Sequence, residues 1–244
     1  FSIAVPGRDL AADANLTIEA SIATEDRAGN KATASTEHAY GADLEAPELA
    51  ITLNGITEDN VINIDEAGRD ITITGTITGE FNEGDTVTLT VNGKEFQGAV
   101  NAEGLFSIAV PGRDLAADAN LTIEASIATE DRAGNKATAS AEHAYGADLE
   151  APELAIALNG ITEDNVINMD EAGRDITITG TVAGEFNEGD TVTLTVNGKE
   201  FQGAVNAEGL FSIAVPGRDL AADANLTIEA SIATEDRAGN KATA

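Results

Sequence analysis

The sequence has no cysteine, no tryptophan and few basic residues, and each shortage excludes a class of function. Without cysteine there is no disulfide framework, no thiolate nucleophile and no Cys-based zinc or iron–sulfur site. The 43 acidic and 13 basic residues give a formal net charge of −30, so the surface repels nucleic acid and anionic membranes. No apolar run is long enough to cross a bilayer. We therefore expect no nucleic-acid partner and no membrane insertion in this region.

The chain also lacks the residue combinations that carry out catalysis. It has no glycine-rich phosphate loop and no Ser-His-Asp set. The adjacent carboxylates Asp65 and Glu66 have no aromatic platform that would hold a sugar beside them. The two histidines, His38 and His143, occupy equivalent positions, and one histidine per repeat is too few ligands for zinc. We expect that the protein is not an enzyme.

What the chain does contain is a repeat with a period of 105 residues. Phe1–Leu10 returns at Phe106–Leu115 and again at Phe211–Leu220. When the 244-residue chain is shifted by 105, only five of the 139 aligned positions differ, all by small or conservative changes: Thr36 to Ala141, Thr52 to Ala157, Ile64 to Met169, Ile77 to Val182 and Thr78 to Ala183. Copies of an active site add little chemistry, whereas copies of a spacer add length. Near-identical copies therefore indicate a structural array.

Alternating apolar and polar residues predict that each repeat is built from β-strands. Isoleucine alternates with threonine in Asp70–Gly79, and Thr86–Val91 repeats the pattern before Asn92-Gly93, a strong signal for a tight hairpin. We predict an all-β fold of tandem Ig-like antiparallel β-sandwiches arranged end to end, with about seven strands per repeat. The only helix expected is one turn within Arg113–Ala119. The predicted core consists of the inward-facing residues Ile71, Ile73, Val87, Leu89, Val91, Phe96, Phe106, Ile108, Leu121, Ile123 and Ile127.

The boundaries between repeats are expected in Tyr145–Pro152 and its copy Tyr40–Pro47. Residues 1–45 would then be the C-terminal part of one repeat, residues 46–150 a complete repeat and residues 151–244 a nearly complete one. Because each linker is short and contains proline, we expect a rod rather than a loose chain. We also expect the sequence to be an excerpt of a longer protein.

Acidic loops are predicted to meet where one repeat joins the next. In an immunoglobulin-type path, the Glu80–Asp85 and Glu130–Asn135 loops lie at the pole where the preceding linker arrives, and the Asn54–Arg69 loop lies at the opposite pole. The candidate oxygen ligands are Asp43, Glu45, Glu83, Asp85, Asp131 and Asn135 at the first junction, Asp148, Glu150, Glu188, Asp190, Asp236 and Asn240 at the second, and Asp59, Asn60, Asn63, Asp65 and Glu66 with the copies Asp164 and Asp170 at the opposite poles. Ca²⁺ takes about six to eight such oxygens in flexible geometry. We therefore expect at least one Ca²⁺ site per repeat.

Two alternatives remain open. Asp, Asn and Gly also dominate ordinary turns for backbone reasons, so each candidate residue has a purely structural explanation, and no EF-hand loop is present because Asp59–Asp65 lacks the central glycine. The alternative function is a glycan- or protein-binding module that acts by avidity. That function would need an exposed aromatic patch in every copy, for which Phe81, in a loop, is the candidate.

Three segments of the complete repeat resemble a known family. They are Val87–Lys94 (VTLTVNGK), Gly104–Pro111 (GLFSIAVP) and Ala128–Asn135 (ATEDRAGN). Their order, spacing and tandem copies resemble the bacterial Ig-like extender domains of large repeats-in-toxin surface adhesins. The linker departs from the family pattern, since leucine separates its Asp and Glu.

The resemblance implies a stalk that projects adhesive modules from the bacterial cell for attachment or biofilm formation, with Ca²⁺ stiffening its junctions. It implies type I secretion to the cell surface, a monomer, neighbouring repeats of the same chain as partners, and an adhesion target bound by modules outside this excerpt. The ligands favoured by the motif match are Asp26, Asn30, Asp131, Asn135, Asp236 and Asn240, with Asp43 and Asp148 from the linkers.

Overall fold

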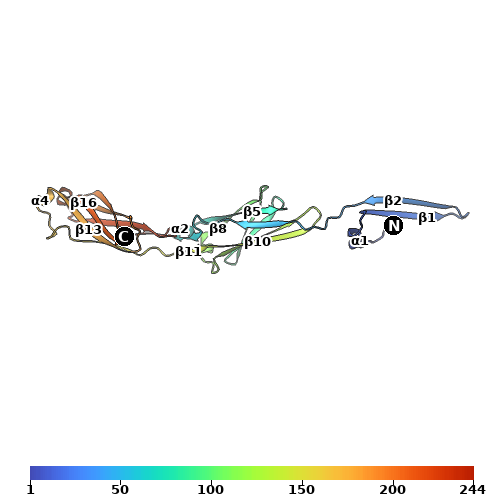
Figure 1. The fold of residues 1–244 in the computed structure, drawn as a ribbon, viewed down its shortest axis with the longest axis horizontal. Helices are drawn as coiled ribbons and strands as arrows, with labels where there is room; N and C mark the ends of the chain where they lie inside the picture. Colours follow the sequence, from blue (N-terminus) through green and yellow to red (C-terminus); the bar gives the residue numbers. More distant parts are fainter.

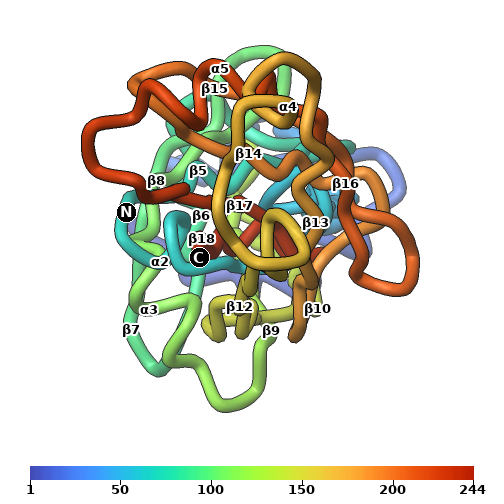
Figure 2. Tube along the Cα trace, turned by 90° about the vertical axis from the view of Figure 1, so that its left-hand side faces the viewer, coloured from blue at the N-terminus to red at the C-terminus, as the bar shows by residue number.

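The computed structural model describes residues 1–244, and its shape is a rod (Figure 1). An N-terminal β-hairpin and two β-sandwiches follow one another along the long axis. Viewed along that axis, the parts lie one behind another (Figure 2). The end-to-end arrangement predicted from the sequence is therefore confirmed.

The first sandwich contains seven main strands in two antiparallel sheets. One sheet has the order β3-β5-β8, with bounds Leu49–Leu53, Asp70–Gly79 and Leu105–Pro111. The other has the order β10-β9-β6-β7, with bounds Lys136–Ala144, Thr122–Glu130, Thr86–Val91 and Lys94–Ala99. The predicted all-β, Ig-like architecture is confirmed.

The second sandwich repeats the same plan. Its sheets have the orders β12-β13-β16 and β15-β14-β17-β18. The bounds are Leu154–Leu158, Asp175–Gly184 and Leu210–Pro216 for the first sheet, and Lys199–Ala204, Thr191–Val196, Glu229–Glu235 and Lys241–Thr243 for the second.

The N-terminal segment forms a hairpin without an opposing sheet. It consists of α1 (Gly7–Ala11), β1 (Thr17–Glu25) and β2 (Lys31–Ala39), and the two strands pair only with each other. Ile22, whose copies lie in the cores of the sandwiches, is 69% exposed here. A segment with two strands cannot bury both faces of its sheet.

The core follows the alternation that the sequence shows. Along β5 the side chains of Ile71, Ile73 and Ile77 point inward, and the threonines between them point outward. The core of the first sandwich has 18 buried residues and that of the second has 12. Phe96 and Leu121 are only partly buried. Phe96 lies on the edge strand β7, and Leu121, with φ 47°, lies in the turn before β9.

Two glycine positions explain local features of the strands. Asn92 and Gly93 have φ 50° and 69°, which is the conformation of a two-residue hairpin turn between β6 and β7. Gly75 in β5 pairs with Phe106, and a Cβ atom at Gly75 would lie 2.4 Å from Cζ of that ring. Glycine is thus required there for Phe106 to pack across the strand.

The C-terminal pole of the first sandwich carries short elements that close its open end. They are β4 (Val61–Ile62), α2 (Ile64–Ala67), α3 (Gly112–Ala116) and β11 (Gly146–Ala147), while α4 (Met169–Ala172) and α5 (Gly217–Ala221) are the helices of the second sandwich. The expected helical turn is found as α3. The helix α2 was not predicted: it begins at a capping box in which Asn63 and Glu66 bond each other's backbone N–H groups.

None of the five helices has the length and apolar character needed to cross a membrane.

Candidate functional site at the interdomain junctions

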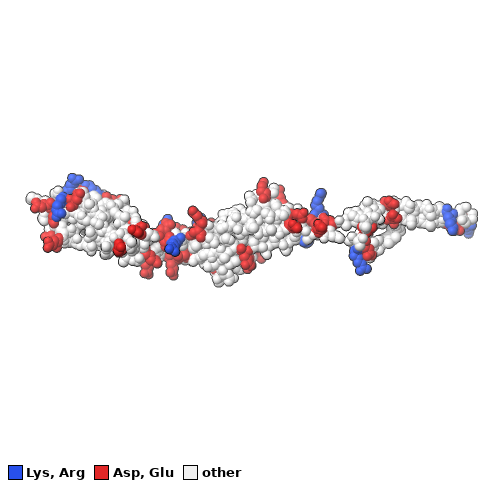
Figure 3. Space-filling view, viewed as in Figure 1, with Lys and Arg blue, Asp and Glu red and all other residues white.

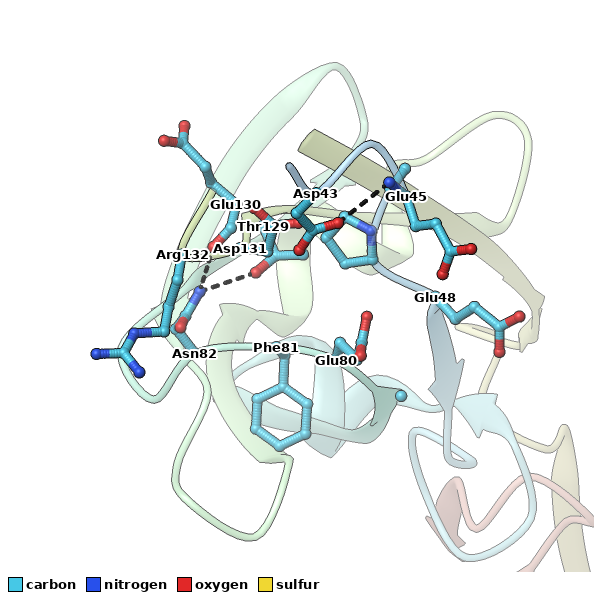
Figure 4. Close-up of a pocket in the computed structure, with 13 residues that line it drawn as sticks. Asp43, Glu45, Glu48, Glu80, Phe81, Asn82, Thr129, Glu130, Asp131 and Arg132 are labelled. Atoms are coloured by element: carbon cyan, nitrogen blue, oxygen red, sulfur yellow. Dashed lines mark hydrogen bonds between the residues drawn. The ribbon is translucent and has the colours of Figure 1, made fainter. Parts of the chain in front are cut away.

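An open cleft of about 820 Å³ lies where the N-terminal segment meets the first sandwich. The linker forms one wall with Asp43, Glu45 and Glu48, and the loops that follow β5 and β9 form the other (Figure 4). Acidic side chains gather at both junctions of the rod (Figure 3). The predicted meeting of the linker with these two loops is therefore present in the structure.

Asp131 and Arg132 in this wall begin a five-residue turn, Asp131–Asn135, that joins β9 to β10. One carboxylate oxygen of Asp131 accepts hydrogen bonds from the backbone N–H groups of Ala133 (2.8 Å) and Asn135 (2.9 Å), and the other accepts the Asn135 amide (2.9 Å). The Asn135 amide and these N–H groups lower the pKa of Asp131 below its ordinary value of 3.8, despite opposing desolvation. Gly134, with φ 93°, supplies the left-handed residue.

The linker contacts this turn directly. The amide nitrogen of Asn135 donates to the carbonyl of Asp43 at 3.2 Å, and Oδ1 of Asp43 accepts the N–H of Glu45 at 3.2 Å. Of the candidates predicted at this junction, Asp43, Glu45 and Asp131 line one cleft. Glu83 and Asp85 do not line it. Asp85 instead accepts the N–H of Asn82 within its own loop at 2.8 Å.

Three acidic residues of the cleft were not among the candidates: Glu48, Glu80 and Glu130. Glu48 and Glu80 are brought together because β3 pairs antiparallel with β5, and the N–H of Glu80 donates to the carbonyl of Glu48 at 2.7 Å. The alternation of apolar and polar residues predicts the strands but not their register. The proximity of Glu48 to Glu80 therefore could not be predicted without the pairing of β3 with β5.

At the second junction the equivalent turn, Asp236–Asn240, packs against the preceding sandwich, with Ala238 and Asn240 buried. The amide of Asn240 donates to the carbonyl of Asp148 (3.1 Å) and to Oδ2 of Asp236 (3.0 Å), and its oxygen accepts the backbone N–H of Ile64 (2.8 Å). The amide of Asn63 donates to the carbonyl of Ala238 at 2.8 Å. Asn63, which was predicted to approach this junction from the opposite pole, therefore reaches it.

The other candidates of that pole have local partners. Asp59 accepts the hydroxyl of Thr57 and the N–H of Val61, and Asp164 does the same in the second sandwich. Glu66 caps α2 and forms an ion pair with Arg69 at 3.3 Å. Asp65 and Asp170 are exposed in the first turns of α2 and α4. Asp190 bonds the N–H of Asn187 at 2.8 Å, and the turn Asp26–Asn30 of the hairpin is exposed.

The linker after the first sandwich is itself held in place. Its strand β11 pairs in parallel with β4, and the N–H of Asp148 donates to the carbonyl of Ile62 at 2.9 Å. Asn60 bonds the carbonyl of Ala144 at 2.9 Å and the ring of His143 at 2.7 Å.

Tyr145, the first residue of this linker, is anchored in the core. Its hydroxyl donates to the carbonyl of Leu115 at 2.9 Å. Burial and the nearby Asp118 carboxylate raise the pKa of Tyr145 well above its ordinary value of 10.0. The linker therefore leaves the first sandwich along a fixed path.

The carboxylates at the junctions are of the chemical type that binds Ca²⁺, since all their donor atoms are hard oxygens. Asp43, Glu45 and Asp131 share the first cleft, but no group of three or more acidic or histidine side chains in the structure is close enough to hold a metal ion. The amide oxygen of Asn240, another predicted ligand, accepts the N–H of Ile64 in this arrangement. The carboxylates are of the right chemical type for Ca²⁺. The amides of Asn63 and Asn240 hold the two sandwiches in contact.

Comparison with known proteins gives matches among solved structures only. No protein-family model and no curated protein matches the chain. A Ca²⁺-stabilised adhesin that helps an Antarctic bacterium reach out and bind ice is 39% identical, with a TM-score of 0.84 over 98% of this chain and 57% of its own. A structure from a 1.5-MDa bacterial ice-binding adhesin, studied for host cell surface retention, is 35% identical, with a TM-score of 0.78 over 100% of this chain and 76% of its own.

A bacterial immunoglobulin-like domain from the M. primoryensis ice-binding adhesin is 38% identical over 42% of this chain and 98% of its own, with a TM-score of 0.38. The chain spans little more than half the length of the first of these relatives, 57%, and about three quarters, 76%, of the second.

Fold and junctions together define a class of protein: tandem β-sandwich repeats joined end to end by short acidic linkers. Within that class, the chain belongs to the family of repeated Ig-like domains of large bacterial ice-binding adhesins.

Proposed function

We propose that this region is a structural extender, the stalk of a bacterial cell-surface adhesin, and that Ca²⁺ bound at its junctions stiffens it. The observation that carries the proposal is the rod itself: two near-identical sandwiches stand in line, and the linker between them is bonded to both. Repeating such a unit adds length in one direction. The adhesive modules, and the target that they bind, belong to other parts of the adhesin.

Each repeat is proposed as one unit of this stalk, with residues 1–45, 46–150 and 151–244 as the three portions present. The region would act outside the cell after type I secretion, as a monomer whose partners are its neighbouring repeats. Catalysis forms no part of the proposal, since the relatives are adhesins.

The proposed Ca²⁺ ligands are the carboxylates of the linker and the facing loops. At the first junction these are Asp43, Glu45 and Asp131, with Glu48 and Glu80 beside them. At the second they are the copies Asp148, Glu150 and Asp236, with Glu153 and Glu185. Close carboxylates repel one another, and a bound cation would turn that repulsion into attraction between the linker and the sandwich.

The alternative, a binding module in each repeat, finds little support. It needs an exposed aromatic residue, and Phe81 packs partly buried against the core instead. Phe186, its copy, packs in the same way in the second sandwich.

We expect Ca²⁺ to raise the melting temperature relative to chelator, because a ligand that binds only the folded state stabilises it. The affinity should be on the order of 10⁻⁴–10⁻³ M, as in other extracellular modules. Calorimetry and thermal melting of the whole chain measure both quantities.

The variant Asp148→Asn/Glu150→Gln removes two proposed ligands and should reduce the heat of Ca²⁺ binding and the gain in melting temperature. The matched control, Glu124→Gln/Glu229→Gln, removes the same charge from exposed positions on β9 and β17 and should behave as wild type. Superimposable melting curves in Ca²⁺ and in chelator would refute the metal part of the proposal.

A further inference from the structure

Each repeat contains one Asn-Leu-Thr tripeptide, which matches the acceptor sequence for N-linked sugars. The copies are Asn15–Thr17, Asn120–Thr122 and Asn225–Thr227. In the first sandwich the tripeptide lies between α3 and β9, in a loop that stands out from the side of the rod (Figure 2). The asparagine is exposed in all three copies. An acceptor asparagine in a secreted protein is expected in a surface loop of this kind.

The side chain of Asn120 has no structural task in the fold. Its backbone N–H donates to Oδ1 of Asp118 at 3.2 Å, and its carbonyl accepts the hydroxyl of Thr122 at 3.0 Å. These backbone contacts recur at Asn15 and Asn225, and in none of the three copies does the side-chain amide form a hydrogen bond. The amide nitrogen is therefore exposed and free to react.

The other asparagines of the first sandwich are explained by its structure. Asn92 has φ 50° in the β6–β7 hairpin turn, a conformation that asparagine tolerates. The remaining ones use their side-chain amides in hydrogen bonds: Asn54, Asn60, Asn63, Asn82, Asn101 and Asn135. Asn120 alone has neither role.

The conformation of the loop does not account for this asparagine either. The residue with left-handed backbone is the leucine that follows it, with φ 48° at Leu16, 47° at Leu121 and 50° at Leu226. Leucine is unfavourable in that conformation, whereas asparagine tolerates it. An asparagine that served the turn would therefore stand at position 121. The reversal at Leu121 instead brings the hydroxyl of Thr122 back to Asn120, so both groups that the acceptor sequence requires lie at one loop tip.

We propose that Asn120 and its copies Asn15 and Asn225 are N-glycosylation sites, so that each repeat of the stalk carries one sugar chain. A separate glycosyltransferase would use a sugar whose C1 is esterified to a diphosphate on a nucleoside or lipid carrier. The amide nitrogen Nδ2 attacks C1, the bond between C1 and the diphosphate oxygen breaks, and the diphosphate leaves with the electron pair. Nδ2 loses one proton to a base of the transferase, and nothing is oxidised or reduced.

A sugar at this position would protect a vulnerable loop. Ala117, Ala119 and Asn120 are small or polar exposed residues at a loop tip, where proteases preferentially cut. A bulky, hydrated sugar chain covers such a tip and keeps the surface soluble. This modification goes beyond the extender function and does not depend on Ca²⁺ binding.

Mass spectrometry of the adhesin isolated from its own bacterium tests the proposal. Trypsin releases the acceptor asparagines in peptides of identical sequence: Asp9–Arg27, Asp114–Arg132 and Asp219–Arg237. We expect this peptide to be heavier by one or more sugars, with the added mass on the asparagine. A series of masses that differ by single sugars would indicate a nucleoside carrier, and one fixed oligosaccharide mass a lipid carrier.

The control peptide is Asp70–Lys94. Its Asn92 is also exposed, but the residue two positions later is Lys94, which has no hydroxyl group. We expect this peptide to be unmodified.

The variant Thr122→Ala, made in the whole adhesin, tests whether the tripeptide directs the modification. It removes the hydroxyl and keeps Asn120. Because it changes the mass of one copy of the peptide, the unchanged copies in the same molecule serve as controls. We expect the sugar to be lost from the variant copy only, and Thr122→Ser, which keeps a hydroxyl, to retain it.

Two results would overturn the proposal. One is an acceptor peptide that is found only without sugar. The other is a Thr122→Ala copy that keeps its sugar, since the added mass would then not depend on the acceptor sequence. Neither result bears on the length or the Ca²⁺ response of the rod, so this proposal and the extender function can fail separately.

Discussion

At the scale of single residues, Asn135 and Asn240 make the same contacts with their own turn and with the linker before it. Asn135 closes its own turn and reaches the linker carbonyl of Asp43. Asn240 makes the same two contacts and in addition accepts the N–H of Ile64 from the neighbouring sandwich.

The turn should weaken in acid because its stability depends on an ionised aspartate. Burial raises the pKa of Asp236, but hydrogen bonds from Asn240 and Ala238 outweigh it and keep the pKa below the ordinary value of 3.8. A lowered pKa gives stability that is fully present above 3.8 and is lost as the pH falls through the folded-state value. We expect Asp236→Asn to destabilise the second sandwich at neutral pH and to cost progressively less as the pH falls below 3.8.

Thermal melts from neutral pH down to acid would measure this difference. Asp26→Asn, the same change in the exposed turn of the hairpin, serves as the control and should leave both sandwiches unaffected. A difference between Asp236→Asn and wild type that does not vary with pH would contradict the assignment.

At the scale of strands and helices, most of the fold was predictable. Alternation of isoleucine and threonine in Asp70–Gly79 gave β5 with the bounds found, and Asn92-Gly93 gave the β6–β7 hairpin. Helix α2 was missed because its capping residues, Asn63 and Glu66, lie in an acidic loop that we interpreted as metal ligands. The β4–β11 pair was missed because two-residue strands far apart in sequence leave no periodic signal.

The candidate site was predictable in location but not in detail. The direction in which the chain runs through an Ig-like sandwich placed the linker beside the loop that ends at Asn135. The two are in contact in the structure. Which carboxylates share the cleft depends on strand register and on each loop's own hydrogen bonds, as with Glu80 and Asp85. The metal ligands themselves stay a prediction.

Helix α2 depends on a glycine that lets it approach α3. A Cβ atom at Gly112 would lie 1.9 Å from the carbonyl oxygen of Glu66. Gly112→Ala must therefore displace α2 and should destabilise the first sandwich by about 1–3 kcal/mol, the usual cost of overpacking. It should also broaden the distribution of distances between the two sandwiches, since α2 begins at Ile64, whose N–H donates to Asn240 of the next sandwich. Chemical denaturation gives the free energy of unfolding.

Gly7 is the matched control, because nothing lies within 4 Å of a Cβ atom placed there. Gly7→Ala should leave the stability of both sandwiches unchanged. A Gly112→Ala variant as stable as wild type would contradict the close packing of α2 on α3.

At the scale of the whole molecule, the acidic charge and the repeated contacts have complementary effects. The net charge of −30 keeps such rods apart from one another, while each junction holds one repeat in line with the next. Copying a unit of this kind lengthens the stalk without changing its direction. Carboxylates concentrated at the junctions (Figure 3) are where a cation would act on the array as a whole.

The central claim, that the chain is a stiff extender, is tested most directly by small-angle scattering of the whole chain in Ca²⁺ and in chelator. We expect the scattering of one extended rod in Ca²⁺, with the two sandwiches in line. Chelator should shorten the mean end-to-end length, because the carboxylates at the junctions are then no longer bridged, and Asp148→Asn/Glu150→Gln should shorten it in Ca²⁺. A maximum dimension in Ca²⁺ that corresponds to sandwiches folded back on each other would contradict the extender function.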